Sequence, residues 1–256
     1  MKRKAKKRYV AVIALFMMLA IAACASEEEQ RADKIAGIKR LTWEDIKELN
    51  GGEMPSLRYD DFGEVNAIAG IYSDFEVRDA EDALLSLYSI ADLFGIEEPE
   101  EEFSLRNESD EPAGDVYMFD QYHEGIPVIG GFVSVHVDES YKTEYLIVTY
   151  KSNFPSSLQP EINRAQLEDL VKESCKGNAV AKAKLVLYPK GEYEEELILC
   201  WEVETTGDAE TAMRVFFNAK TGERLYSEPL FISLIRVKDL KMCLTNSVKR
   251  CMLRLS

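Results

Sequence analysis

The chain has 256 residues, of which 46% are hydrophobic and 30% charged, and its formal net charge is −15 at pH 7. This length allows one large or two small domains with a buried core, and the composition is that of a globular protein. The negative charge argues against a nucleic-acid partner, because phosphate binding needs clustered Lys and Arg. Five cysteines without a CxxC pair indicate neither a disulfide framework nor a zinc site.

The amino terminus has the pattern of an export signal. Basic residues crowd positions 2–8, and an uninterrupted run of apolar and small residues follows at 10–23. The run ends in IAAC at 21–24, which resembles the bacterial lipobox. The resemblance implies a cleaved signal peptide over 1–23, a lipid on Cys24 and anchoring on the extracytoplasmic side of a bacterial envelope. An ordinary signal peptide with an incidental cysteine and an uncleaved anchor are the alternatives.

Residues 24–56 are predicted to form a charged tether between the anchor and the folded part. Within this range, Thr42 followed by acidic residues predicts a short capped helix that Asn50-Gly51-Gly52 ends.

The next part of the chain alternates between β-type and helical patterns. Residues 55–77 favour β structure, and 79–95 are expected to form a helix that Asp79 caps and Gly95 ends. A strand is predicted to begin at Phe103-Ser104-Leu105, followed by a polar, turn-rich segment at 107–114.

The stretch 115–138 predicts a β-hairpin with an irregularity. Glu124-Gly125 interrupts the strand pattern, and a glycine there supplies the positive φ of a tight turn. Pro127 fits a strand start or an edge strand, and Gly130-Gly131 permits a bend or a close backbone approach.

The run QYHEGIPVIGG at 121–131 resembles the Q-x-Y-x-G-I-P-V-x-G-G signature of the fungalysin/thermolysin propeptide (FTP) domain, the pro-region of thermolysin-family zinc metalloproteases. Such a pro-region assists the folding of its protease and inhibits it until cleavage. The resemblance implies a partner-facing or conformation-setting hairpin, for which the candidate residues are Gln121, Tyr122, Gly125, Ile126, Pro127 and Val128. Of these two roles we favour the structural one, because glycine and proline signatures usually mark backbone geometry.

The second half begins after the proline-containing linker at 154–160. A helix is expected at 163–176, followed by strands at 183–188, 197–203, 213–217 and 224–226. This helix and meander resemble the PepSY domain, in particular LVLYPKG and RVFFNAKTGERL.

The predicted fold class is α+β, and the two resemblances imply cystatin-like halves, each a helix packed on a curved antiparallel sheet. The predicted organisation is a signal peptide at 1–23, a tether at 24–56, an FTP-like domain at 57–154, a PepSY-like domain at 155–231 and an atypical basic tail at 232–256.

No residue pattern predicts catalysis, a metal site or a cofactor. The protease family's zinc site needs an HExxH helix, but the only histidines are His123 and His136, and Pro127 would stop a helix after HEGIP. Cys175 and Cys200 fall in helical and strand patterns as small hydrophobic residues. We therefore expect a non-enzymatic chain.

The expected partner is a thermolysin-like metalloprotease, in cis as in the family or in trans, and the membrane is contacted only through the lipid. A stand-alone envelope binding or regulatory module and a non-functional pro-fragment of a truncated metalloprotease gene are the alternatives. The tail is either genuine or the product of truncation or a shifted reading frame, and we favour truncation or a shifted frame. Whether Cys243 and Cys251 pair stays open.

Overall fold

The computed structural model describes residues 31–111, 114–175, 177–191, 196–207 and 211–230. The predicted signal peptide, Cys24, the basic tail at 232–256 and its two cysteines lie outside the described residues. The chain divides into two compact units, one of residues 1–119 and 134–148 and one of residues 120–133 and 149–256. The second unit therefore includes the tip of the predicted hairpin, residues 120–133.

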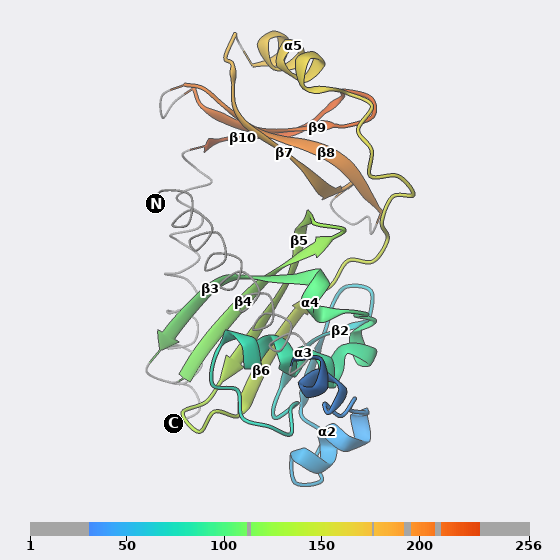
Figure 1. The fold of residues 1–256 in the computed structure, drawn as a ribbon, viewed down its shortest axis with the longest axis vertical. Helices are drawn as coiled ribbons and strands as arrows, with labels where there is room; N and C mark the ends of the chain where they lie inside the picture. Colours follow the sequence, from blue (N-terminus) through green and yellow to red (C-terminus); the bar gives the residue numbers. More distant parts are fainter. Residues whose placement is uncertain (1–30, 112–113, 176, 192–195, 208–210, 231–256) are drawn as a thin grey trace, which may run out of the picture. The chain divides into compact units, whose positions relative to one another are not determined.

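The first unit is an antiparallel sheet with helices (Figure 1). Its strands follow the order β1-β2-β6-β5-β4-β3. The strand bounds are β1 Ser56–Tyr59, β2 Val65–Ala69, β3 Phe103–Glu111, β4 Gly114–His123, β5 Ile126–Val137 and β6 Thr143–Thr149. The helices are α2 Trp43–Leu49, α3 Ala80–Phe94 and the one-turn α4 Pro99–Glu102, and residues 31–36 are also helical.

Helix α3 forms where its apolar spacing and caps predict it. Asp79 accepts a hydrogen bond from the Asp82 amide, and Gly95 ends the helix in the left-handed conformation at φ 66°. Its side chains Leu85, Leu87 and Ile90 have no exposed surface. Every residue from Leu85 to Ala91 is buried, so this part of the helix is covered on all sides and supplies much of this unit's core.

Part of the range predicted as a tether is folded. Helix α2 has the expected capping box between Thr42 and Asp45, and Leu41 and Ile46 are buried. The Asn50 side chain accepts a hydrogen bond from the Ile71 amide and donates one to the Ile71 carbonyl. Leu41 and Ile46 thus pack into the first unit, and Lys34 before them pairs with Asp82 at the start of α3.

The prediction of a polar, turn-rich segment at 107–114 is wrong for most of that range, because β3 continues to Glu111. Within the described residues β3 pairs only with β4. An edge strand tolerates charged residues on its open side, so the hydrophobic alternation that reveals an inner strand is missing from its sequence.

The second unit places helix α5 on one face of a meander (Figure 1). Its elements are α5 Arg164–Ser174, β7 Val180–Pro189, β8 Leu197–Thr205, β9 Met213–Asn218 and β10 Arg224–Pro229, with strands in the order β7-β8-β9-β10. Leu167 and Val171 of α5 pack on Val203, Val215 and Phe217 of the sheet. The predicted α+β class, a helix on an antiparallel sheet in each half, is confirmed.

One strand pair departs from the antiparallel pattern. At the hairpin tip, strand β5 pairs with β7 in parallel, with Val128 opposite Leu187. This pairing places the tip at the β7 edge of the second unit's sheet.

Candidate functional site

The hairpin tip turns through two residues with positive φ. Strand β4 ends at His123 and β5 begins at Ile126, and between them Glu124 has φ 47° and Gly125 has φ 77°. Two consecutive positive φ values define the type I′ turn, whose twist matches that of the flanking strands. Gly125 therefore meets a backbone requirement, since an L side chain rarely adopts its conformation.

Gln121 fastens the hairpin to the chain that follows β6. Its side chain is buried, its Nε2 donates to the Lys151 carbonyl at 2.7 Å, and its Oε1 accepts from the Lys151 amide at 3.0 Å. The side-chain amide thus satisfies both backbone groups of Lys151, as a neighbouring strand would.

Gly131 leaves room for this amide. A Cβ at position 131 would lie 2.2 Å from Gln121 Oε1 and 2.9 Å from Gln121 Cβ. Gln121 and Gly131, both part of the signature, therefore depend on each other: the absence of a side chain at Gly131 leaves the space that the Gln121 side chain occupies.

Val128 and Ile126 hold the tip on the second sheet. Val128 is 4% exposed and packs with Leu187, Leu197, Leu199 and Ala219, and Ile126 lies against the same cluster. Pro127, half-buried between them, lacks the N–H that an inner strand residue would donate.

The aromatic residues at the end of β4 have separate surroundings. The His123 ring stacks on Phe154, with centroids 3.6 Å apart and planes 6° apart. Tyr122 is half-buried, whereas Glu124 and Gly125 at the turn are exposed. Of the candidate residues, Tyr122, Gly125, Ile126 and Pro127 retain exposed surface, while Gln121 and Val128 are covered.

The contacts that complete the tip come from residues that sequence reasoning did not select. Lys151, Phe154 and Leu187 lie far from the hairpin in sequence, and no local pattern marks them. The glycine pair Gly130-Gly131 is the one available signal, because it indicates a close approach without naming what approaches.

The described residues include no group of three or more His, Cys, Asp or Glu side chains placed to hold a metal ion. Cys175 and Cys200 are free and buried, and burial raises the pKa of the Cys200 thiol to about 12. A thiol this poorly ionised is a weak nucleophile.

His136 lies on β5 in the first unit. Its Nε2 is 3.0 Å from Ser134 Oγ, and its ring meets Tyr145 edge-on. Burial lowers the pKa of its imidazole to about 4, because the charged form loses hydration.

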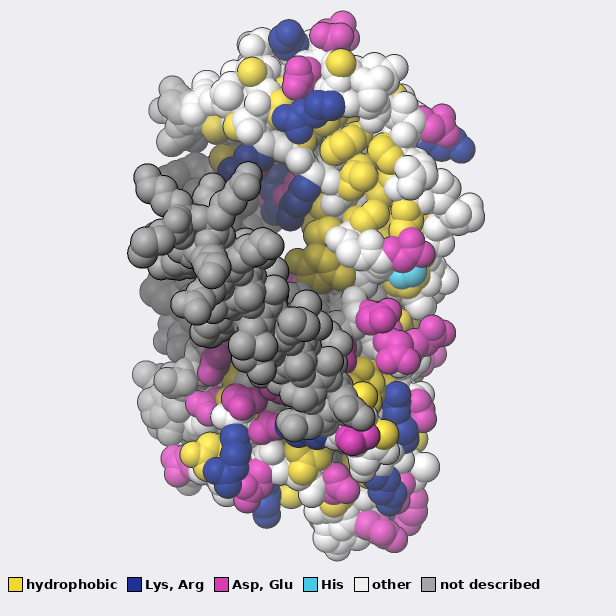
Figure 2. All heavy atoms as spheres, viewed as in Figure 1, with side chains coloured by type: hydrophobic (Ala, Val, Ile, Leu, Met, Phe, Trp, Pro, Cys, Tyr) yellow, Lys and Arg dark blue, Asp and Glu magenta, His cyan; other side chains and the backbone are white. Residues whose placement is uncertain are grey.

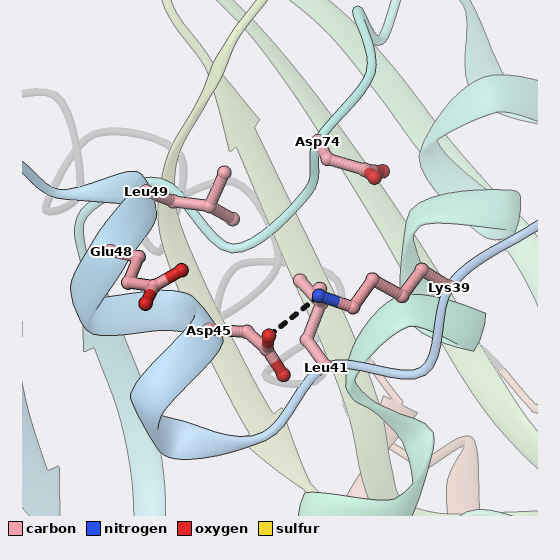
Figure 3. Close-up of a pocket in the computed structure, with 6 residues that line it drawn as sticks. All are labelled: Lys39, Leu41, Asp45, Glu48, Leu49 and Asp74. Atoms are coloured by element: carbon pink, nitrogen blue, oxygen red, sulfur yellow. Dashed lines mark hydrogen bonds and ion pairs between the residues drawn. The ribbon is translucent and has the colours of Figure 1, made fainter.

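A pocket of about 220 Å³ opens beside α2 in the first unit (Figure 3). Its charged lining comes from Lys39, Asp45, Glu48 and Asp74, with Leu41 and Leu49 beside them. Lys39 Nζ reaches Asp45 Oδ1 at 2.6 Å, and the hydrogen bond from Lys39, with those from Thr42, holds the pKa of the Asp45 carboxyl below its usual value. Lys39 and Asp45 therefore pair with each other, and Glu48 and Asp74 are the other charged residues of the lining.

No helix among the described residues is long and apolar enough to cross a membrane. On the face shown in Figure 2, acidic and basic side chains are interspersed, while hydrophobic side chains gather over the second unit.

Residues 101–142 match the family model described as the Fungalysin/Thermolysin Propeptide Motif. The matched segment contains β3, β4 and β5, and all six candidate hairpin residues lie within it. The remainder of the 256-residue chain lies outside this match. The hairpin described above is thus the centre of an FTP-like segment.

Eight chains of solved structures also match. One is the Bacillus megaterium YpeB C-terminal domain, which is 14% identical, with a TM-score of 0.36, covering 74% of this chain and 98% of that one. No curated protein matches the sequence.

Proposed function

We propose that this chain is a propeptide-type module that binds a thermolysin-like metalloprotease, assists its folding and inhibits it. The observation that carries the proposal is the FTP match at 101–142, whose signature residues build one docked hairpin tip. Gln121 and Val128 attach the tip to the second unit, while the turn and the flanking side chains retain exposed surface for a partner.

The physical basis of the activity is binding alone. A surface that is complementary to the folded protease, but not to its unfolded chain, raises the protease's free energy of unfolding by mass action. The same surface inhibits the protease when it covers the substrate cleft. Neither effect requires a reactive group on the module.

A refolding experiment tests the folding role. A denatured thermolysin-like protease, freed of its own pro-region, is diluted into buffer with or without the purified full chain. We expect the yield of active enzyme, assayed after the module is removed, to rise severalfold with the module. A chain with Gly131→Ala, which disturbs the tip, should raise it less. An equal yield with and without the folded chain would contradict the proposal and favour a stand-alone binding module.

The location is part of the same proposal. The amino-terminal pattern supports export and a lipid on Cys24, which would keep the module at the outer side of a bacterial membrane. Radiolabelled palmitate should be incorporated into the expressed protein and lost with Cys24→Ser. Incorporation that persists in this variant would refute Cys24 as the lipid site.

A further inference from the structure

A basic segment before α2 lies against two helices of the first unit. Residues 31–40, called the strap below, carry four basic side chains and a single acid. The strap is followed by Leu41, which is buried and donates its amide to the Ser89 carbonyl of α3 at 2.6 Å. The carboxyl end of the strap is therefore fixed to the core of the unit.

The amino-terminal half of the strap pairs with acids of both helices. Lys34 Nζ lies 2.9 Å from Asp82 Oδ1 at the start of α3, and Arg31 pairs with Glu100 of α4. In Figure 1 this part of the strap, in dark blue, lies beside α3.

Arg40 attaches the other half of the strap to α3. Its Nη1 lies 3.5 Å from Asp92 Oδ1, and its guanidinium lies over the Tyr88 ring, 5.3 Å from the centroid. The fourth basic residue, Lys39, pairs instead with Asp45 of α2. Three ion pairs thus join the strap to α3 and α4.

Each of these three pairs is weak and sensitive to salt. The side chains of Arg31, Lys34 and Arg40 are 41%, 50% and 38% exposed, and Ile35 and Ile38 of the strap are only half-buried. Exposed ion pairs add little stability, and salt screens them, because the Debye length falls from about 10 Å at 0.1 M to about 3 Å at 1 M. The strap can therefore leave the helices while the core stays folded.

We propose that the strap opens and closes with ionic strength and thereby sets how far the lipid anchor lets the first unit reach from the membrane. This control of reach rests on the lipid at Cys24 proposed above. With the strap paired, the seven residues from Cys24 to Arg31 span at most about 25 Å. With the strap released, the 17 residues from Cys24 to Leu41 span up to about 60 Å. A partner of the closed form must therefore approach the membrane.

Hydrogen exchange of the full chain, followed by mass spectrometry, tests the pairing. The amides of residues 31–38 should exchange at least fivefold faster in about 1 M than in about 0.05 M sodium chloride. The segment 85–91 of α3, where every residue is buried, should exchange at one rate in both and so show that the unit stays folded. Equal exchange of the strap at both salt concentrations would overturn the proposal.

Charge reversal separates ion pairing from other effects of salt. Arg31→Glu combined with Arg40→Glu should open the strap at low salt, with exchange at least fivefold faster than in the unmodified chain. Adding Asp92→Arg and Glu100→Arg restores both pairs with their signs exchanged, and should return the rate to within twofold. A strap that stays protected in the double variant, or one that the two added changes do not protect again, would contradict the pairing.

Energy transfer from tryptophan to a dansyl-labelled lipid measures the reach. Trp43 lies just after the strap and is the one tryptophan left in Trp201→Phe. In phosphatidylcholine vesicles that carry the lipidated chain, transfer from Trp43 should fall at least twofold when Arg31→Glu and Arg40→Glu open the strap. It should recover when Asp92→Arg and Glu100→Arg are added.

Two results would overturn different parts of the account. Unchanged transfer in a variant whose strap exchanges faster would show that the strap does not set the reach. A chain without lipid on Cys24 would refute the anchor and with it the control of reach, while hydrogen exchange would still decide whether the strap opens.

Discussion

At the scale of single residues, the Gln121 amide and the missing side chain of Gly131 depend on each other. The methyl group of Gly131→Ala would displace Gln121 and break both of its hydrogen bonds to Lys151. We expect a loss of about 2 kcal/mol in the free energy of unfolding, from overpacking and from the unpaired polar groups. Urea denaturation followed by tryptophan fluorescence measures this loss.

Gly37→Ala is the control for this variant, since its new Cβ would meet only ordinary contacts at 3.4 and 3.5 Å. It should change the free energy of unfolding by less than about 0.5 kcal/mol. If the two variants are equally stable, Gln121 does not clamp Lys151 as described.

His136 predicts a pH dependence of stability. Because burial lowers its pKa to about 4, the folded state favours the neutral imidazole, while the unfolded state binds a proton near pH 6.5. The stability that depends on the neutral imidazole of His136 is fully present above pH 6.5 and is lost as the pH falls toward 4.

The free energy of unfolding should therefore fall by about 2 kcal/mol more in the unmodified chain than in His136→Gln between pH 7 and pH 4.5. Comparing the two chains cancels the titration of carboxylates, and His123 remains as the other histidine in both. Parallel pH profiles of the two chains would show that His136 is not buried in its neutral form.

At the scale of elements, the turn sets the register of the hairpin. In Gly125→Val a β-branched side chain would have to adopt a φ of 77°, which should destabilise the protein by about 1–3 kcal/mol. Glu124→Asn, at φ 47°, should be neutral or stabilising, because asparagine tolerates this conformation. Thermal melting of both variants tests the assignment, and an unaltered melting temperature for Gly125→Val would rule out the type I′ turn.

The elements that sequence analysis predicted well are those specified by neighbours in the chain. Helix α3 has its caps and its apolar spacing within Asp79 to Gly95, and the turn of the hairpin is specified by Glu124-Gly125. Helix α5 is likewise capped by Asn163, whose capping box with Gln166 is local.

The elements that could not be predicted depend on distant partners. The last part of β3 is a strand because β4 pairs with it, although its own residues are polar. The parallel pairing of Val128 with Leu187 joins residues far apart in sequence, and no periodicity reports such a pair. The candidate residues lie on β4, on β5 and in the turn between them, while their partner-facing or conformation-setting role stays a prediction. The surface on which the hairpin rests was not foreseen.

At the scale of the whole molecule, the proposed function requires a binding surface rather than a reactive group. Tyr122 lies beside the turn and retains exposed surface, so part of its side chain remains available to a partner. Tyr59, 56% exposed on β1, is a tyrosine of the first unit that provides a matched control.

Inhibition is tested most directly by the rate at which a thermolysin-like metalloprotease hydrolyses a fluorogenic peptide while increasing amounts of the full chain are added. We predict saturable inhibition that approaches completion near equimolar protein. The inhibition constant should rise at least fivefold with Tyr122→Ala and stay unchanged with Tyr59→Ala. A rate that stays constant at high excess of the folded chain, against proteases of this class, would contradict this prediction.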